Sequence, residues 1–449
     1  MDALEKAEEA VDILRAVDAR GSLAAALYRL SRFCGWVGDA RAMPLREEAL
    51  RVAEESGPST ELLQVLEYWV ADYSTACADA ATIAAADRAL ALSAQLHVPP
   101  SVRVLHYRGL ARCNGDESAG LADVRRSLDL AKAQGLGREI GDFSYNYAEQ
   151  VCNYRGPREA LEIVREGLAV ATRRSNAAAV GYLVQAELLD LWLLGDWSGE
   201  EAREDELETM LQEQRNLVDL ALHWGIRALR GLAQGSGGLA SRESALAQAY
   251  AQASSAGPYP ELDQFCATVL LALHAALGDA EAVDRWLGAL EESVAATGRG
   301  PMLSLYLPTA TRELSRAAAV EAVADAPLSR IFAIGDHLAT GRKSDTGAAA
   351  SLSAIGAEAD GALDAAEALF AEAERIWSEM EIPYERAHSQ LGRGRCLVAL
   401  GRAQEAAAPL TEAREVFARL GARPALAETE AVLERIGQPS AGRTDGGHA

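Results

Sequence analysis

Polar side chains recur at helical spacing in one stretch of the chain, residues 143–154. Asn146, Gln150 and Asn153 are spaced i, i+4 and i+7, which places three amides on one face of a helix. Amides on a groove wall can pair with the backbone of an extended peptide, whose polar groups need partners once they lose water. The stripe therefore predicts a binding surface for a peptide or small ligand. An ordinary solvated helix face is the alternative that this pattern leaves open.

Other patterns resemble catalytic or cofactor motifs but fail on spacing. Residues 335–344 have five residues between two glycines and an arginine after the second, and no buried strand precedes them to present a phosphate loop. Gly392-Arg393-Gly394 is followed by Leu397 where a dinucleotide fingerprint needs its third glycine. The sequence contains no Cys/His cluster with metal-ligand spacing and no nucleophile elbow. We therefore expect no enzyme activity, no cofactor and no metal.

The helices that must position these amides belong to a sequence pattern that repeats along the chain. A glycine or short polar turn, followed by a helix rich in small residues, recurs about every 40 residues. The turns begin at Gly38, Ala78, Gly115, Gly156, Gly195, Gly237, Gly278, Gly361 and Gly401. Such a period is typical of stacked helical hairpins, each of which buries its apolar face against its neighbours. We expect an all-α fold, a right-handed α-α superhelix of about ten tetratricopeptide-like hairpins.

The hairpin at the C-terminal end matches the tetratricopeptide pattern best. With Gly401 at position 15 of a 34-residue unit, Gly394, Ala406 and Ala413 take the small positions that let two helices close together. Positions 5, 9 and 12 of the first helix then face the concave groove. Counting back from the turns between residues 112 and 234 predicts a groove that contains Arg112, Asn146, Gln150, Asn153, Gln185, Trp192, Trp224, Arg227 and Gln234.

Five of the six cysteines occur just before a turn, at the end of the first helix of a hairpin. They are Cys34, Cys77, Cys113, Cys152 and Cys396. A small apolar side chain at that point lets the two helices approach, so we interpret these residues as packing groups rather than a disulfide or metal set.

Residues 382–387, Leu400-Gly401-Arg402 and residues 417–424 resemble the end of the helical-repeat region in large actinobacterial signalling ATPases. That group includes LuxR-type transcriptional regulators and adenylate or guanylate cyclase homologues that carry an ATPase module. The match covers about residues 361–437. The chain has a polar, Gly-rich tail where LuxR-type members have a helix-turn-helix, so the cyclase-like layout fits better.

The resemblance implies a non-catalytic protein-interaction or sensor module in signal transduction or transcription regulation. Its partner would be a protein or peptide, with an attached or associated ATPase or cyclase domain. The alternative function is a sensor that binds a small ligand or peptide in a concave pocket around residues 143–234. A protein scaffold predicts dispersed contacts, whereas a sensor predicts one concentrated polar pocket.

The net charge of the chain argues against two classes of partner, nucleic acids and membranes. The chain has 43 Lys and Arg against 66 Asp and Glu, a formal net charge of −23, which repels phosphate backbones and anionic lipid. We expect neither direct nucleic-acid binding nor membrane association. The first residues are acidic and amphipathic rather than a signal sequence, so a cytoplasmic location is the default.

The repeats predict four segments. Residues 1–340 form a helical-repeat solenoid, 341–360 a weakly packed loop or joint, 361–437 the C-terminal repeats and 438–449 a disordered tail. The helix expected over residues 3–17 aligns with the second helix of a hairpin and lacks a first-helix partner. We therefore expect the chain to be part of a longer protein.

Overall fold

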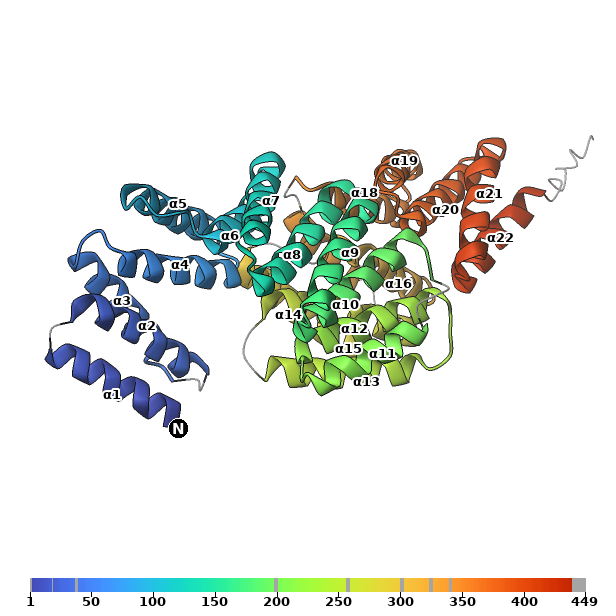
Figure 1. The fold of residues 1–449 in the computed structure, drawn as a ribbon. Coiled ribbons are helices and arrows are strands. Elements are labelled where there is room, and N and C mark those ends of the chain that lie inside the picture. Colours follow the sequence, from blue (N-terminus) through green and yellow to red (C-terminus); the bar gives the residue numbers. More distant parts are fainter. Residues whose placement is uncertain are drawn as a thin grey trace, which may run out of the picture. The chain divides into compact units, whose positions relative to one another are not determined.

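The structure is a computed structural model that describes residues 2–17, 19–36, 39–197, 201–255, 259–298, 303–322, 326–338 and 341–437. These residues form 22 α-helices and one short 3-10 helix, with no strand among them (Figure 1). The prediction of an all-α chain is confirmed. The expected turn at Gly38 and the tail 438–449 lie outside the described residues.

The first eleven helices are α1 (Asp2–Ala16), α2 (Arg20–Trp36), α3 (Ala42–Glu55), α4 (Thr60–Thr75), α5 (Asp79–Gln95), α6 (Val102–Arg112), α7 (Glu117–Gln134), α8 (Gly137–Arg155), α9 (Pro157–Arg173), α10 (Ala177–Leu194) and α11 (Glu201–Glu213). The remaining helices are α12 (Leu217–Ala233), α13 (Leu239–Ser254), α14 (Pro260–Leu277), α15 (Ala280–Thr297), α16 (Leu307–Ala319), α17 (Ala326–Gly335), α18 (Lys343–Ala359), α19 (Leu363–Glu379), α20 (Pro383–Ala399), α21 (Ala403–Leu420) and α22 (Arg423–Gly437). The 3-10 helix is η1 (Asp336–Leu338).

Contacts divide the chain into two compact units. The first unit comprises Met1–Val151, Ala160–Ala186 and Ala251–Pro260, and the second comprises Cys152–Glu159, Glu187–Tyr250 and Glu261–Ala449. The sequence-based segments 1–340 and 361–437 describe runs of repeats rather than compact units, and they stay a prediction.

The first unit is built from helical hairpins. Consecutive helices pack together, as α2 does with α3 and α6 with α7, and helices two apart also touch, as α2 does with α4 and α4 with α6. The second kind of contact joins each hairpin to the next. A core of buried residues around Trp69, Val65 and Val104 fills the space between them. This arrangement is the one that the 40-residue period predicts.

Small residues set the distance between the two helices of a hairpin. A Cβ atom added to Gly120 of α7 would lie 2.5 Å from the backbone nitrogen of Cys113 at the end of α6. Cys113 is fully buried, and all six cysteines are buried with no disulfide between them. Their positions agree with the packing role inferred from the sequence.

The second unit departs from a linear stack, in which each repeat would contact only its neighbours. Gly156, Gly195 and Gly235 lie in turns with φ of 102°, 77° and 58°, a backbone region that glycine adopts without steric cost. A Cβ at Gly156 would collide with the carbonyl oxygen of Met380, and one at Gly235 would lie 2.8 Å from Pro424. The turns of the middle hairpins therefore pack against the C-terminal repeats, one against Met380 just before α20 and another against Pro424 in the first turn of α22.

Polar contacts strengthen this long-range packing within the second unit. Arg158 forms an ion pair of 2.6 Å with Glu381, 223 residues away in sequence. Arg423 donates from Nε to the carbonyl oxygen of Gln234, at 2.8 Å, and also bonds the carbonyl of Gly235. A guanidinium at the C-terminal end of α12 satisfies carbonyl groups that the helix leaves open.

The segment 341–360 differs from the weakly packed loop or joint expected for it. Residues 343–359 form α18, whose buried positions include Gly347, Ala348 and Leu352. Gly347 lies against Trp377 of α19, and the Trp377 Nε1 donates to Ser351 Oγ at 3.0 Å. The alanines and serines that resembled a loop are the small residues that a crowded helix requires.

Among the described residues one helix, α10, is long and apolar enough to cross a membrane, with a mean hydropathy of 1.4. Half of that stretch is buried inside the protein, and core helices of soluble proteins pass the same test. We treat α10 as a core helix.

We predict that Gly120→Ala lowers the free energy of unfolding by about 2 kcal/mol, because its Cβ would force α6 and α7 apart. The matched control is Gly115→Ala in the turn between these helices, where no atom lies within 4 Å of an added Cβ. The control should change stability by less than about 0.5 kcal/mol. Urea unfolding followed by circular dichroism measures both, and equal effects would contradict the close-approach explanation.

Candidate functional site

The nine predicted groove residues divide between the two units. Arg112, Asn146, Gln150 and Gln185 belong to the first unit, whereas Asn153, Trp192, Trp224, Arg227 and Gln234 belong to the second. A single groove over residues 143–234 therefore stays a prediction, and each residue is described within its own unit.

Asn146 supports a buried histidine in the first unit. Its Nδ2 lies 2.9 Å from Nε2 of His106, and the other ring nitrogen of His106 lies 3.4 Å from Ser127 Oγ. Ser127 donates its own proton to the carbonyl of Val124, so its oxygen remains to accept from the ring. His106 therefore carries its proton on Nδ1 and accepts from Asn146. The half-buried amide is engaged inside the unit.

The other amides are buried. Gln150, Asn153 and Gln185 expose 9%, 4% and 5% of their surface. In the second unit, Asn153 Oδ1 accepts a hydrogen bond of 2.8 Å from Ser344 at the start of α18. The side-chain oxygens of Gln150 and Gln185 have no hydrogen-bond partner in the described part of the chain. Asn146, Gln150 and Asn153 share α8 as predicted, but they do not form an exposed polar stripe.

Both arginines of the predicted groove, Arg112 and Arg227, form ion pairs with carboxylates of the same unit. Arg112 pairs with Asp123 at 3.0 Å, and Arg227 pairs with Glu208 at 3.0 Å while its guanidinium stacks on Trp224. Trp192 is buried, and Gln234 ends α12 with its carbonyl bonded to Arg423. These residues make contacts inside their own units. Helical spacing in the sequence does not show whether a side chain makes such contacts or faces a groove.

A cavity of about 200 Å³ lies in the second unit between α16, α18, α19, α20 and α22. Helices α16 and α18, α18 and α20, and α20 and α22 touch one another although another helix separates each pair in sequence. These alternate helices are the ones that line the groove of a hairpin stack. The lining residues are Arg312, Ser315, Arg316, Ala319, Ser351, Ile355, Glu358, Ala359, Phe370, His388, Ser389, Arg395 and Glu428.

The groove rule used for the middle repeats also applies here. Counting back from Gly361 places Ser351, Ile355 and Glu358 at positions 5, 9 and 12, and counting from Gly401 places Arg395 at position 9. All four line the cavity. The same count, extended to the C-terminal repeats, therefore identifies these four residues from the sequence. The predicted groove was limited to the repeats around the amide stripe.

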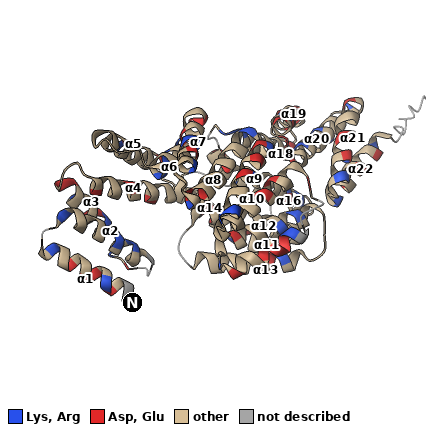
Figure 2. Ribbon diagram, in the orientation of Figure 1, with Lys and Arg blue, Asp and Glu red and all other residues tan. Residues whose placement is uncertain are grey.

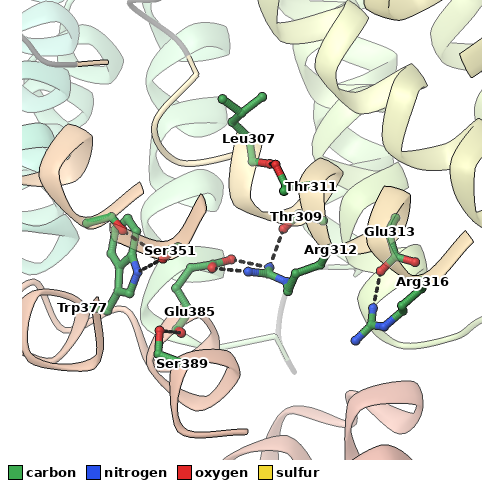
Figure 3. A network of polar contacts seen from close by, with 11 residues as sticks. Leu307, Thr309, Thr311, Arg312, Glu313, Arg316, Ser351, Trp377, Glu385 and Ser389 are labelled. Carbon is green, nitrogen blue, oxygen red and sulfur yellow. Dashed lines mark hydrogen bonds and ion pairs between the residues drawn. The ribbon is translucent and has the colours of Figure 1, made fainter. Parts of the chain in front are cut away.

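Arg312 is the most buried arginine of the polar wall, with 11% of its side chain exposed, and Figure 3 shows its contacts with Glu385 and Thr309. Its two terminal nitrogens bond the carboxylate of Glu385 at 2.6 and 2.7 Å, and one of them also bonds Thr309 Oγ1. Burial acts to lower the pKa of Arg312, but Glu385 outweighs it and raises that pKa above its ordinary value. The pair is a fixed, ionised part of the wall.

A second run of ion pairs joins four helices, α16, α18, α20 and α22. Arg395 bonds Glu358 through Nε at 2.8 Å and through one terminal nitrogen at 2.6 Å, and its other terminal nitrogen bonds Glu428 at 2.6 Å. The second oxygen of Glu428 accepts from Arg316 at 3.1 Å, and Arg316 also contacts Glu313 (Figure 3). Burial acts to raise the pKa of Glu428, but Arg395 and Arg316 hold it below its ordinary value.

His388 adds an unsatisfied group to the cavity. It exposes 6% of its surface, and its Nε2 has no hydrogen-bond partner among the described residues. Its ring lies edge-on to Tyr384 at 4.6 Å. Burial, together with Arg312, Arg316 and Arg395, lowers the pKa of His388 well below its ordinary value, so the imidazole is neutral at physiological pH.

Apart from Ser315, the rest of the wall is apolar or already bonded. Ile355 and Phe370 are buried, and Ala319 and Ala359 lie at the exposed rim. The hydroxyl groups of Ser351 and Ser389 donate hydrogen bonds of 2.9 and 3.0 Å to backbone carbonyls of their own helices. A small cavity with an apolar side and a few fixed polar groups is the usual form of a small-molecule site.

No protein-family model matches the chain, and no curated protein matches it. Among solved structures, yeast Tom70 is 10% identical, with 92% of this chain and 96% of that one covered and a TM-score of 0.38. The APC/C hetero-tetramer Cut9-Hcn1 is 11% identical, with 97% and 96% covered and a TM-score of 0.33. At these scores the similarity carries no argument, and the all-α hairpin fold rests on the helices of the chain itself.

We predict that the first unit loses stability on acidification through His106. Burial, with a smaller effect of Arg103, lowers the pKa of His106 from 6.5 to about 3. The unfolded chain therefore takes up a proton below pH 6.5 that the folded chain refuses, so stability is fully present above pH 6.5 and falls as the pH drops towards 3. At pH 5 the loss is about 2 kcal/mol.

Native-state hydrogen exchange of α6 and α8, corrected for the intrinsic rate at each pH, measures this loss. His106→Gln should remove most of the difference between pH 7 and pH 5, whereas His97→Asn, at an exposed position, should retain it. A pH dependence that persists in the His106→Gln variant would show that another group carries it.

Proposed function

We propose that the chain is a non-catalytic binding module that senses a small molecule, and that it acts as the helical-repeat part of a signalling protein. The observation that carries the proposal is the cavity between α16, α18, α19, α20 and α22. There a buried ion pair, a run of partly exposed ion pairs and an imidazole whose Nε2 has no partner among the described residues meet an apolar wall. A concentrated polar pocket is what distinguishes a small-molecule sensor from a scaffold with dispersed contacts.

The energetics of the wall support this proposal. Buried ion pairs contribute little net stability, because the cost of removing two charges from water offsets their attraction. Arg312 and Glu385 expose only 11% and 5% of their side chains, and replacing such a buried pair by apolar residues of similar size is often neutral or stabilising. Fixed charges beside a cavity instead favour recognition, because their geometry is set before a ligand arrives.

A protein or peptide partner is the second candidate. The side-chain oxygens of Gln150 and Gln185 in the first unit are buried and lack hydrogen-bond partners in the described part of the chain, so N–H donors of an extended peptide would satisfy them only where binding exposes these side chains. This candidate keeps residues 143–234 as the partner surface, in a module that binds no nucleic acid or membrane. Lys and Arg are interspersed with Asp and Glu over the helices (Figure 2), which agrees with a surface that is not specialised for phosphate.

The signalling context rests on the resemblance of residues 361–437 to helical repeats of signalling ATPases. In that context the module would be cytoplasmic and would regulate an attached or associated ATPase or cyclase. The same segment supplies Phe370, His388, Arg395 and Glu428 to the cavity. Ligand binding would therefore act on the helices through which the resemblance links the module to its effector.

We predict that Ala359→Trp abolishes small-molecule binding, because Ala359 lies at the exposed rim and an indole there fills the cavity at little cost to the fold. The control is Ala418→Trp on α21, exposed and outside the cavity lining. The measurement is ligand-observed NMR of the full chain with a library of acids, amides, amines and alcohols, each of about a dozen heavy atoms.

The parent and the Ala418→Trp variant should bind a common set of compounds that the Ala359→Trp variant does not bind. If the parent binds none of the four chemical classes, or the Ala359→Trp variant binds the same compounds, the cavity is not a small-molecule site.

A further inference from the structure

We propose that the ligand of this cavity is a small organic acid with an apolar body, whose carboxylate is held by Arg316 and Arg395. This inference rests on the proposed function and adds the chemical class of the ligand. Neither the helical repeat nor the resemblance to signalling ATPases specifies that class.

The two guanidinium groups already share one carboxylate. Glu428 places one oxygen 2.6 Å from a terminal nitrogen of Arg395 and the other 3.1 Å from a terminal nitrogen of Arg316. The pair thus has the separation and orientation that a bridging carboxylate needs. A ligand carboxylate can exchange with Glu428 one for one, and the charge balance of the wall is then unchanged.

Both arginines also keep donors for such a ligand. A guanidinium has five N–H groups. Arg316 uses one donor for Glu313 and one for Glu428, and Arg395 uses two for Glu358 and one for Glu428. Arg316 and Arg395 expose 37% and 31% of their side chains, compared with 11% for Arg312. The accessible donors therefore belong to Arg316 and Arg395.

Hydrogen-bond use, rather than net charge, opposes the reverse assignment. The three arginines of the cavity wall meet four carboxylates, Glu358 and Glu428 in the wall and Glu313 and Glu385 outside it, and each carboxylate already accepts from an arginine. An ammonium ligand would lie beside two guanidinium groups and would compete with them for carboxylates that they already hold. A carboxylate ligand meets the spare N–H groups directly, and arginine binds that group in a planar, two-point geometry.

The apolar wall determines the rest of the ligand. Ile355 and Phe370 face the same cavity as the two arginines. A cavity of about 150 Å³ holds a benzene ring, so the 200 Å³ here accommodates a ring or a branched chain together with its carboxylate. Acetate or inorganic phosphate would leave this side unfilled. The geometry thus favours acids of about a dozen heavy atoms.

Isothermal titration of the full chain tests the assignment with phenylacetate, indole-3-acetate and octanoate, each beside its neutral amide and the amine of the same skeleton. We expect at least one acid to bind ten-fold or more tightly than its amide and amine. Arg316→Gln should weaken that acid at least ten-fold. Glu428→Gln should strengthen it several-fold, because the competing carboxylate is removed and the side-chain shape is kept.

The control is Arg375→Gln, an exposed arginine of α19 that pairs with Glu379 outside the cavity, and it should leave affinity unchanged. Circular dichroism confirms that each variant is folded. A purely structural role of these residues would not shift affinity in opposite directions in the Arg316→Gln and Glu428→Gln variants.

If amides or amines bind as tightly as acids, the acid assignment is wrong although the cavity remains a small-molecule site. If no acid binds while the NMR library yields ligands of another class, the assignment is also wrong. Binding that is insensitive to Ala359→Trp would instead contradict the proposed function.

Discussion

The close approach of paired helices at small residues is the constraint on which the other features depend. In α20, a Cβ on Gly394 would lie 2.5 Å from Leu410 of α21, and one on Gly392 would collide with the ring of Phe370 in α19. Both neighbours therefore press directly on the backbone of α20. His388 and Arg395 lie on another face of this helix, where they line the cavity. Close packing of the backbone thus leaves a face of α20 on which polar side chains can line a cavity.

The polar wall is explained better by recognition than by stability. Arg395, Glu428 and Arg316 join α20, α22 and α16 through alternating charges, and partly exposed pairs of this kind contribute little to stability while they fix side-chain geometry. The neutral His388 beside them has no partner for Nε2 in the part of the chain that the structure describes. A stack of hairpins needs neither feature in order to fold. Both features are useful to a site that must hold a polar group of a ligand in one orientation.

The sequence predicted the hairpins well because period and small residues are local signals. Ala406 and Ala413, placed at small positions by counting from Gly401, are fully buried. The site was harder to predict, because the partners of a groove residue lie one or more hairpins away. Asn146 matches the groove pattern, yet it bonds His106, 40 residues earlier. The packing of residues 341–360 does not follow from composition, because alanine and serine are common both in loops and in tightly packed helices.

The central claim is that the Arg316–Glu428 contact exists for binding rather than for folding. The most direct measurement compares the parent with the double variant Arg316→Gln, Glu428→Gln, by urea unfolding and by titration with the acid that the parent binds. The account predicts a free energy of unfolding within about 1 kcal/mol of the parent's, since a partly exposed ion pair contributes little and the amides can still hydrogen-bond the neighbouring charges, together with loss of acid binding. A marked fall in stability with acid affinity retained would contradict it.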